Sequence, residues 1–160
     1  MRKIIMMAAG AAVLSASPAF AATEDATMPV TANVLDSCTI TASPMSFGTL
    51  TTLGSANIDS TSSVAILCTL GATYDVSMDA GANASGAQRQ LVNSTDAAQL
   101  IPYGVFTDAA RATDWNGTNT QAGVGTGAVQ TLTAYGRIPA SASSVTAGVY
   151  NDSVTVTVTF

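Results

Sequence analysis

The chain ends on a strict two-residue alternation, Asp152-Ser-Val-Thr-Val-Thr-Val-Thr-Phe160. In an extended strand the apolar side chains of this segment share one face and the Ser and Thr side chains share the other. The apolar face consists of Val154, Val156, Val158 and Phe160. Edge strands usually carry Lys, Pro, a bulge or an inward charge that blocks further pairing, and after its first aspartate this segment has none of them. We therefore expect the segment either to lie inside a sheet or to pair with a strand from elsewhere.

A second alternating segment lies near the N-terminus, in Thr23-Glu-Asp-Ala-Thr-Met-Pro-Val-Thr-Ala-Asn-Val-Leu-Asp-Ser-Cys38. It can serve as the first strand of a self-contained sandwich. If it cannot fold back onto its own domain, it can instead complete the sheet of a neighbouring copy. Because such a head-to-tail contact does not close, it generates a fibre. Pro29 cannot donate a ladder hydrogen bond, so the paired region is expected to be firm from Val30 onward.

The first residues have the features of a secretory signal peptide. Arg2 and Lys3 form a short basic region, an apolar run extends over residues 4–14, and small residues near Ala21 and Ala22 provide a cleavage site. The apolar run is short for a bilayer-spanning anchor, although a retained N-terminal membrane helix is the alternative. We expect cleavage after residue 22, export through the periplasm and no direct membrane insertion of the mature chain.

Removal of residues 1–22 leaves ten acidic residues and only Arg89, Arg111 and Arg137 as bases, a net charge of −7 (3 minus 10). A surface of this sign repels nucleic acid and anionic lipid, so we expect neither as a partner. The chain has no histidine, and the mature part has no lysine. Catalysis would therefore depend on carboxylates such as Asp75 and Asp79, which are more often solvated strand residues. We expect no enzymatic activity, no metal site and no cofactor.

Cys38 and Cys68 are the two cysteines of the chain. In an oxidising compartment the default expectation is a disulfide between them. The alternatives are an intermolecular bond or a metal pair, and the absence of histidine leaves too few ligands for a zinc site.

Strand patterns recur along the mature chain, while three-turn amphipathic helix patterns are missing. The expected strands are residues 34–41, 63–70, 73–79, 88–92, 101–107, 129–138 and 149–160. Gly123, Gly125 and Gly127 resemble a phosphate loop, but no helix pattern follows them and no lysine lies among them, so residues 122–128 are predicted to be a flexible connection. About seven strands at this spacing indicate a sandwich. The single Trp115 is expected in its core, and Arg137 is expected to pair with a surface acid.

Several motifs together resemble the spore coat protein U family and, within it, the major pilin subunits of archaic chaperone–usher pili. The motifs cover nearly the whole mature chain. They are Cys38 with Phe47-Gly48, Ile66-Leu-Cys-Thr69, Tyr74-Asp-Val-Ser-Met-Asp-Ala-Gly81, Arg89, Leu100-Ile-Pro-Tyr-Gly-Val-Phe-Thr-Asp-Ala-Ala110, Trp115, Ala134-Tyr-Gly-Arg-Ile-Pro139 and Ala147-Gly-Val-Tyr-Asn-Asp-Ser-Val-Thr-Val-Thr-Val-Thr-Phe160.

The resemblance implies an all-β fold, an incomplete immunoglobulin-like β-sandwich that a donor strand from another subunit completes. It divides the chain into a signal peptide (residues 1–22), a donor-strand segment (residues 23–35) and a pilin domain (residues 36–160). The implied donor residues are Met28, Val30, Ala32 and Val34, and the implied acceptor-groove strand contains Val154, Val156, Val158 and Phe160.

The partners implied are a periplasmic chaperone that lends a strand first, an outer-membrane usher, and further copies of the chain in a surface fibre for attachment and biofilm formation. One alternative is a monomeric secreted β-sandwich that binds a carbohydrate or surface ligand, which would require a cluster of exposed aromatic residues. A minor or tip-proximal pilus subunit is the other.

Overall fold

The computed structural model describes residues 20–160, and the chain divides into one unit that ends at Asn33 and another that spans Val34–Phe160. The predicted signal peptide, residues 1–22, lies outside the described residues except for its last three. Within the described part no helix has the length and hydrophobicity needed to cross a membrane. Residues 20–37 contain no strand, and every regular element belongs to the second unit.

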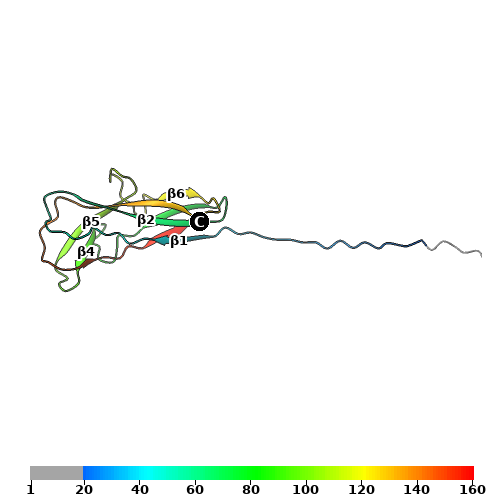
Figure 1. Cartoon of the computed structure of the whole chain (residues 1–160), viewed down its shortest axis with the longest axis horizontal. Coiled ribbons are helices and arrows are strands. Elements are labelled where there is room, and N and C mark those ends of the chain that lie inside the picture. The colour runs from blue at the N-terminus through cyan, green and yellow to red at the C-terminus, as the bar shows by residue number, and fades with distance from the viewer. Residues whose placement is uncertain (1–19) are drawn as a thin grey trace, which may run out of the picture. The chain divides into compact units, whose positions relative to one another are not determined.

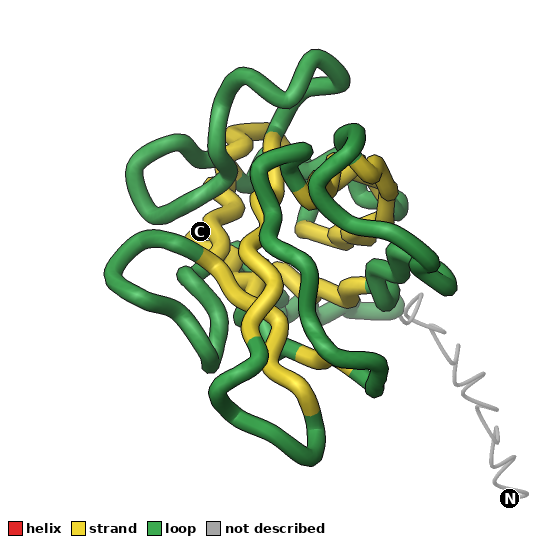
Figure 2. Tube along the Cα trace, turned by 90° about the vertical axis from the view of Figure 1, so that its left-hand side faces the viewer, coloured by secondary structure: helices red, strands yellow, loops and turns green. Residues whose placement is uncertain are grey.

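The second unit is built from antiparallel strands in two sheets (Figure 1). In chain order the strands are β1 (Cys38–Ala42), β2 (Ile58–Cys68), β3 (Thr73–Met78), β4 (Arg89–Asn93), β5 (Leu100–Phe106), β6 (Gln121–Val124), β7 (Gln130–Ile138), β8 (Tyr150–Asn151) and β9 (Val156–Thr159). The larger sheet has the order β1-β2-β7-β5-β4-β8, and the smaller sheet has the order β6-β3-β9. Figure 2 shows long loops between the strands and no helix in the described part. The predicted all-β sandwich class is confirmed.

Two features of the strand prediction are wrong. Residues 121–124 form β6, paired with β3, where a flexible connection was expected. Its glycine leaves the alternation of side chains too weak to recognise. The last segment, predicted as one strand over residues 149–160, is split: β8 pairs with β4 in the larger sheet, and β9 pairs with β3 in the smaller one. Residues 152–155 carry the chain from one sheet to the other.

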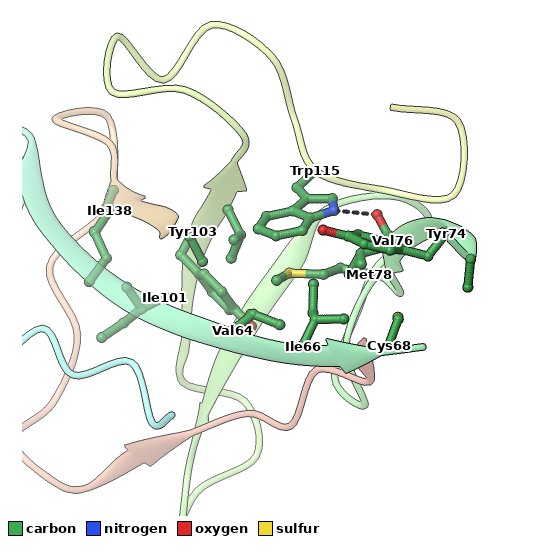
Figure 3. Packing of buried hydrophobic residues seen from close by; sticks show 14 residues of the cluster. Val64, Ile66, Cys68, Tyr74, Val76, Met78, Ile101, Tyr103, Trp115 and Ile138 are labelled. Carbon is green, nitrogen blue, oxygen red and sulfur yellow. Dashed lines mark hydrogen bonds between the residues drawn. The ribbon is translucent and has the colours of Figure 1, made fainter. Parts of the chain in front are cut away.

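The core lies between the sheets and is centred on Trp115, which is fully buried (Figure 3). Its indole Nε1 donates a hydrogen bond of 2.8 Å to the carbonyl oxygen of Val76 in β3. A buried indole N–H needs such a partner, so the bond fixes the ring against the smaller sheet. The prediction that the single tryptophan belongs to the core is confirmed. The other buried apolar side chains include Val64, Ile66, Val76, Met78, Ile101, Tyr103 and Ile138.

Arg89 is also buried, with 4% of its surface exposed, which the sequence analysis did not predict. Its guanidinium donates from Nε to the carbonyl oxygen of Asp79 at 3.0 Å and from Nη2 to that of Trp115 at 2.7 Å. A buried cation is tolerated only when its donors are satisfied. Arg89 therefore connects the end of β3 to the loop that holds the central tryptophan.

Cys38 and Cys68 form the predicted disulfide, which joins β1 to β2. The two residues lie directly opposite each other in the ladder, with their Cα atoms 4.1 Å apart. Because β1 is a short strand at the edge of the larger sheet, the bond ties down an element that would otherwise fray.

Replacing both cysteines, Cys38→Ser with Cys68→Ser, should lower the free energy of unfolding by about 3–4 kcal/mol, because the crosslink closes a loop of the unfolded chain. Denaturant unfolding followed by Trp115 fluorescence, at equal protein concentration, measures the difference. An unchanged unfolding midpoint would show that β1 does not depend on the crosslink.

Candidate functional site

The most unusual feature of the sandwich is a pair of strand edges that face each other without pairing. β1 is the outermost strand of the larger sheet and pairs with β2, while β9 is the outermost strand of the smaller sheet and pairs with β3. β1 and β9 lie side by side, as Figure 1 shows near the C-terminus. Among residues 20–160 no strand forms a ladder between them.

The backbone of β9 directs hydrogen-bonding groups into this gap. The amide of Asp79 donates to the carbonyl oxygen of Thr155 at 3.0 Å, which places Thr155 among the residues that bond toward β3. In an antiparallel ladder, alternate residues point their N–H and C=O groups to opposite sides. The residues between, Val154, Val156 and Val158, therefore present their backbone groups to the gap.

The backbone of β1 does the same from the opposite side. Ser43 donates to the carbonyl oxygen of Ser63 at 2.8 Å, and Thr69 donates to that of Ser37 at 2.9 Å. Ser37 and Ser43 thus bond toward β2, and by the same alternation Cys38, Ile40 and Ala42 turn their backbone groups to the gap. Each edge therefore offers a row of unpaired donors and acceptors to the other.

An apolar cavity of about 320 Å³ opens at one end of the gap. One wall is formed by residues 42–47, after β1, and the other by residues 152–156, before and at the start of β9. Core side chains form the floor: Val64, Met78, Leu91, Tyr103, Val105 and Ala134. Because part of the core is reachable from solvent here, we define the gap and its cavity together as the groove.

The predicted acceptor residues lie along this groove. Val154 and Val156 line the cavity, Val158 follows on the same half-buried face of β9, and Phe160 is exposed at the end of the chain. The structure therefore places Val154, Val156 and Val158 along one edge of the groove, with Phe160 directly after β9.

The opposite wall was missed by the sequence analysis. Met45 and Phe47 pack against the core from the loop after β1. Gly136 in β7 makes this possible, because a Cβ there would collide with the Met45 sulfur. The Phe47-Gly48 motif was the available signal, but a loop phenylalanine has no periodicity that shows where it packs.

Polar groups anchor the crossover between β8 and β9. Asp152 Oδ1 accepts hydrogen bonds from the amide of Asn83 at 3.1 Å and from its Nδ2 at 3.0 Å. Asp152 Oδ2 accepts from the Tyr103 hydroxyl at 2.8 Å. Burial, followed by the bond to the Asp152 carboxylate and its charge, raises the pKa of Tyr103 well above its ordinary value. The hydroxyl therefore remains a donor. Gly81, with φ +85°, leaves the space that the carboxylate fills.

Asp79 fixes the next part of the crossover. Its Oδ1 accepts from the amide of Thr155 at 2.8 Å and from that of Gly81 at 2.9 Å, while its own carbonyl oxygen is occupied by Arg89. Burial acts to raise the pKa of Asp79, but the bonds from Thr155 and Gly81 and the charge of Arg89 outweigh it, so the pKa lies below its ordinary value.

The predicted donor residues are all exposed: Met28 by 81%, Val30 by 86%, Val34 by 80%, and Ala32 with them. The chain just before β1 is held differently. Thr69 donates from its amide to Ser37, and its Oγ1 lies 3.4 Å from the carbonyl oxygens of Leu35 and Ser37. Residues 35–37 therefore continue the line of β1 beyond the disulfide.

A second cavity of about 640 Å³ is lined by Arg89, Asp114 and Arg137 among others. Arg89 already bonds to backbone carbonyls, and Arg137 pairs with Asp59 at 2.7 Å, which confirms the predicted surface pair. Among the described aromatic residues only Phe20 and Phe160 are exposed. The cluster of exposed aromatic side chains that a carbohydrate platform would need is missing from residues 20–160.

Comparison with known proteins gives consistent results. The model of the Spore Coat Protein U domain family matches residues 24–157. The chain is similar to Protein U of Myxococcus xanthus, with 29% identity over 177 residues that cover 98% of this chain and 96% of that protein.

It is also similar to a chain in the solved chaperone–tip adhesion subunit pre-assembly complex from archaic chaperone–usher Csu pili of Acinetobacter baumannii. The identity is 27% and the TM-score 0.60 over 79% of this chain, which spans 40% of the matched chain.

The anchoring role of Asp79 predicts a pH dependence. Because its folded-state pKa is lowered, the ionised carboxylate stabilises the fold above the ordinary value of 3.8, and this contribution is lost as the pH falls through the folded-state pKa. Asp79→Asn should therefore be less stable than the wild type at neutral pH, with the difference shrinking as the pH falls below 3.8 and through the folded-state pKa. Denaturant unfolding across this range measures it; a difference independent of pH would contradict the assignment.

Proposed function

Because the chain belongs to the Spore Coat Protein U domain family, we propose that it is a structural pilin subunit of an archaic chaperone–usher pilus. The family and the solved relative together support a pilus-related subunit. In our proposal each copy donates residues 23–35 to the groove of the next copy, so that the chain polymerises head-to-tail.

The observation that carries this proposal is the pair of unpaired edges around an apolar groove. A strand between β1 and β9 gains backbone hydrogen bonds from both edges, and its alternate side chains enter the cavity above the core. The donor segment has the apolar alternation that such a strand requires. Each backbone hydrogen bond that an incoming strand makes with an edge contributes about 0.5–1.5 kcal/mol, which favours association.

The geometry also favours donation to a neighbour over folding back. β1 and β9 run in opposite directions, because Ala42 at the end of β1 and Val154 before β9 line the same cavity. A donor that turned back into its own groove would reverse at residues 35–37 and run parallel to β9. Those residues are bonded to Thr69 in line with β1. Donation to a neighbour needs no reversal and permits an antiparallel ladder with β9.

The antiparallel ladder also accommodates Pro29. The inward donor residues Met28, Val30, Ala32 and Val34 lie opposite the inward residues of β9, whose backbone groups face the gap. These donor residues therefore bond to β9, and the residues between them point their backbone groups toward β1. The missing N–H of Pro29 is on the β1 side, so the ladder with β9 is complete.

The proposed partners follow from the need to protect the open groove of a subunit before it is assembled. An isolated subunit with an open groove must be protected, and a periplasmic chaperone that lends a strand provides this. The solved relative is a complex of a subunit with its chaperone, which supports such a partner. An outer-membrane usher then exchanges the lent strand for the donor of the next subunit. The fibre is exported to the cell surface, where it serves attachment and biofilm formation.

Removing residues 23–32 should abolish fibres and leave a chaperone-bound monomer, because the acceptor groove remains while the donor is lost. Electron microscopy of surface fibres and size-exclusion chromatography of periplasmic extracts measure both results. A truncated chain that polymerised as the full chain does would contradict the donor assignment. A secreted binding module would be monomeric with or without the segment.

A matched pair of substitutions tests whether alternate side chains of the donor segment face the groove. Val30→Asp should prevent polymerisation, because it places a charge in the apolar groove at a cost of several kcal/mol. Thr31→Asp should polymerise nearly normally, because the neighbouring side chain points away from the groove. Ladders of subunit multimers that resist dissociation, seen on gels of unheated samples, measure polymerisation. Equal effects of the two substitutions would exclude a donor strand in which Val30 faces the groove and Thr31 faces away from it.

A further inference from the structure

Tyr103 touches both walls of the groove. Its hydroxyl donates to Asp152 on the β9 side at 2.8 Å. Its ring packs edge-to-face on Phe47 on the β1 side, with ring centroids 6.1 Å apart and an interplanar angle of 66°. The side chain itself is 5% exposed and rises from β5 on the floor of the groove.

The wall that Tyr103 reaches through Asp152 begins with residues 152–155, which belong to no strand. Residues 152–155 are bonded to residues 79–83: Asp152 accepts from the amide of Asn83, the Ser153 carbonyl oxygen accepts from the amide of Ala82, and the amide of Thr155 donates to the Asp79 carboxylate. The backbone groups of Val154 face the gap. Beside it lies a cavity of about 320 Å³, large enough that neighbouring side chains gain contacts by moving into it.

We propose that Tyr103 is a positioning residue that sets the width of the groove and keeps it open for an incoming strand. The inference rests on the proposed function, since it concerns acceptance of the donor. A tyrosine ring is rigid along its length, so it fixes the separation of the two groups that it contacts. Before insertion no donor side chain fills the cavity, and the hydroxyl–carboxylate bond holds the Asp152 wall. After insertion the donor side chains separate the walls, and the bond matters less.

Tyr103→Phe tests this, because it keeps the ring on Phe47 and removes only the bond to Asp152. The mature chain, residues 23–160, is unfolded with its disulfide intact and refolded at nanomolar concentration, where copies do not meet. A fluorescent peptide of residues 23–35 is then added, and its uptake is followed by anisotropy. We expect Tyr103→Phe to slow uptake about tenfold, the factor that corresponds to a lost hydrogen bond to a charged group. The melting temperature of the peptide-filled form should change little.

Tyr135→Phe is the matched control, since its ring lies below Arg111 with 5.7 Å from the guanidinium carbon to the ring centroid, on the other face of the larger sheet. It should take up the peptide at the wild-type rate. Phe47→Leu, which preserves the hydrogen bond and removes the aromatic contact, should also slow uptake. It provides the same test if the first variant does not refold.

The outcomes separate the two proposals. If the wild type does not take up the peptide, the proposed function fails. If the wild type takes it up and both Tyr103→Phe and Phe47→Leu do so at the same rate, only the positioning role is overturned. Equal destabilisation of the empty and filled forms would likewise overturn it, because it would assign Tyr103 to general stability.

Discussion

One constraint governs this structure: within residues 20–160, the backbone groups on the facing edges of β1 and β9 have no strand to pair with. In a closed sandwich or barrel the groups on β1 and β9 would pair with each other or with an intervening strand. Here the edges are near but unpaired, and the space between them reaches the core. Ile40, Val154, Val156 and Val158 are half-buried because each packs against the core on one side and borders the gap on the other.

An open groove of this kind is stable only if its walls are held from elsewhere, and polar groups do this on the β9 side. The carbonyl oxygen of Asp79 accepts a hydrogen bond from Arg89. The amide of Thr155 donates to the Asp79 carboxylate in place of this carbonyl oxygen. Asp152 accepts hydrogen bonds from Asn83 and Tyr103. Buried hydrogen-bonded networks contribute little net stability compared with apolar packing, but they specify geometry. That property suits the proposed acceptor groove, whose shape must persist before a donor strand arrives.

The sequence was sufficient for the class of fold, the disulfide and the strand-like character of the C-terminal end, because all three depend on local alternation or on residue type. The strand predicted near the N-terminus stays a prediction, since residues 20–37 contain no strand. The crossover at residues 152–155 was not predictable in this way. The crossover depends on hydrogen bonds that Asp152 accepts from Asn83 and Tyr103, and these two residues are distant from it in sequence. Period-two alternation continues through the crossover because the side chains still alternate while the partner strand changes. Burial of Arg89 was missed for the same reason, since its partners are carbonyl groups that no motif reveals.

In the proposed pilus, the direction of the chain before β1 favours donation to a neighbouring copy over filling of the chain's own groove. Thr69 holds residues 35–37 in line with β1, pointing past the disulfide end of the domain. The cavity opens at the other end of the groove, beside Ala42 and Val154. In the proposed assembly the donor segment and the groove form a heterologous, head-to-tail contact, which extends into a filament when the rotation between copies does not close. In the proposed pilus, the few residues between donor and β1 thus determine the polarity of the whole assembly.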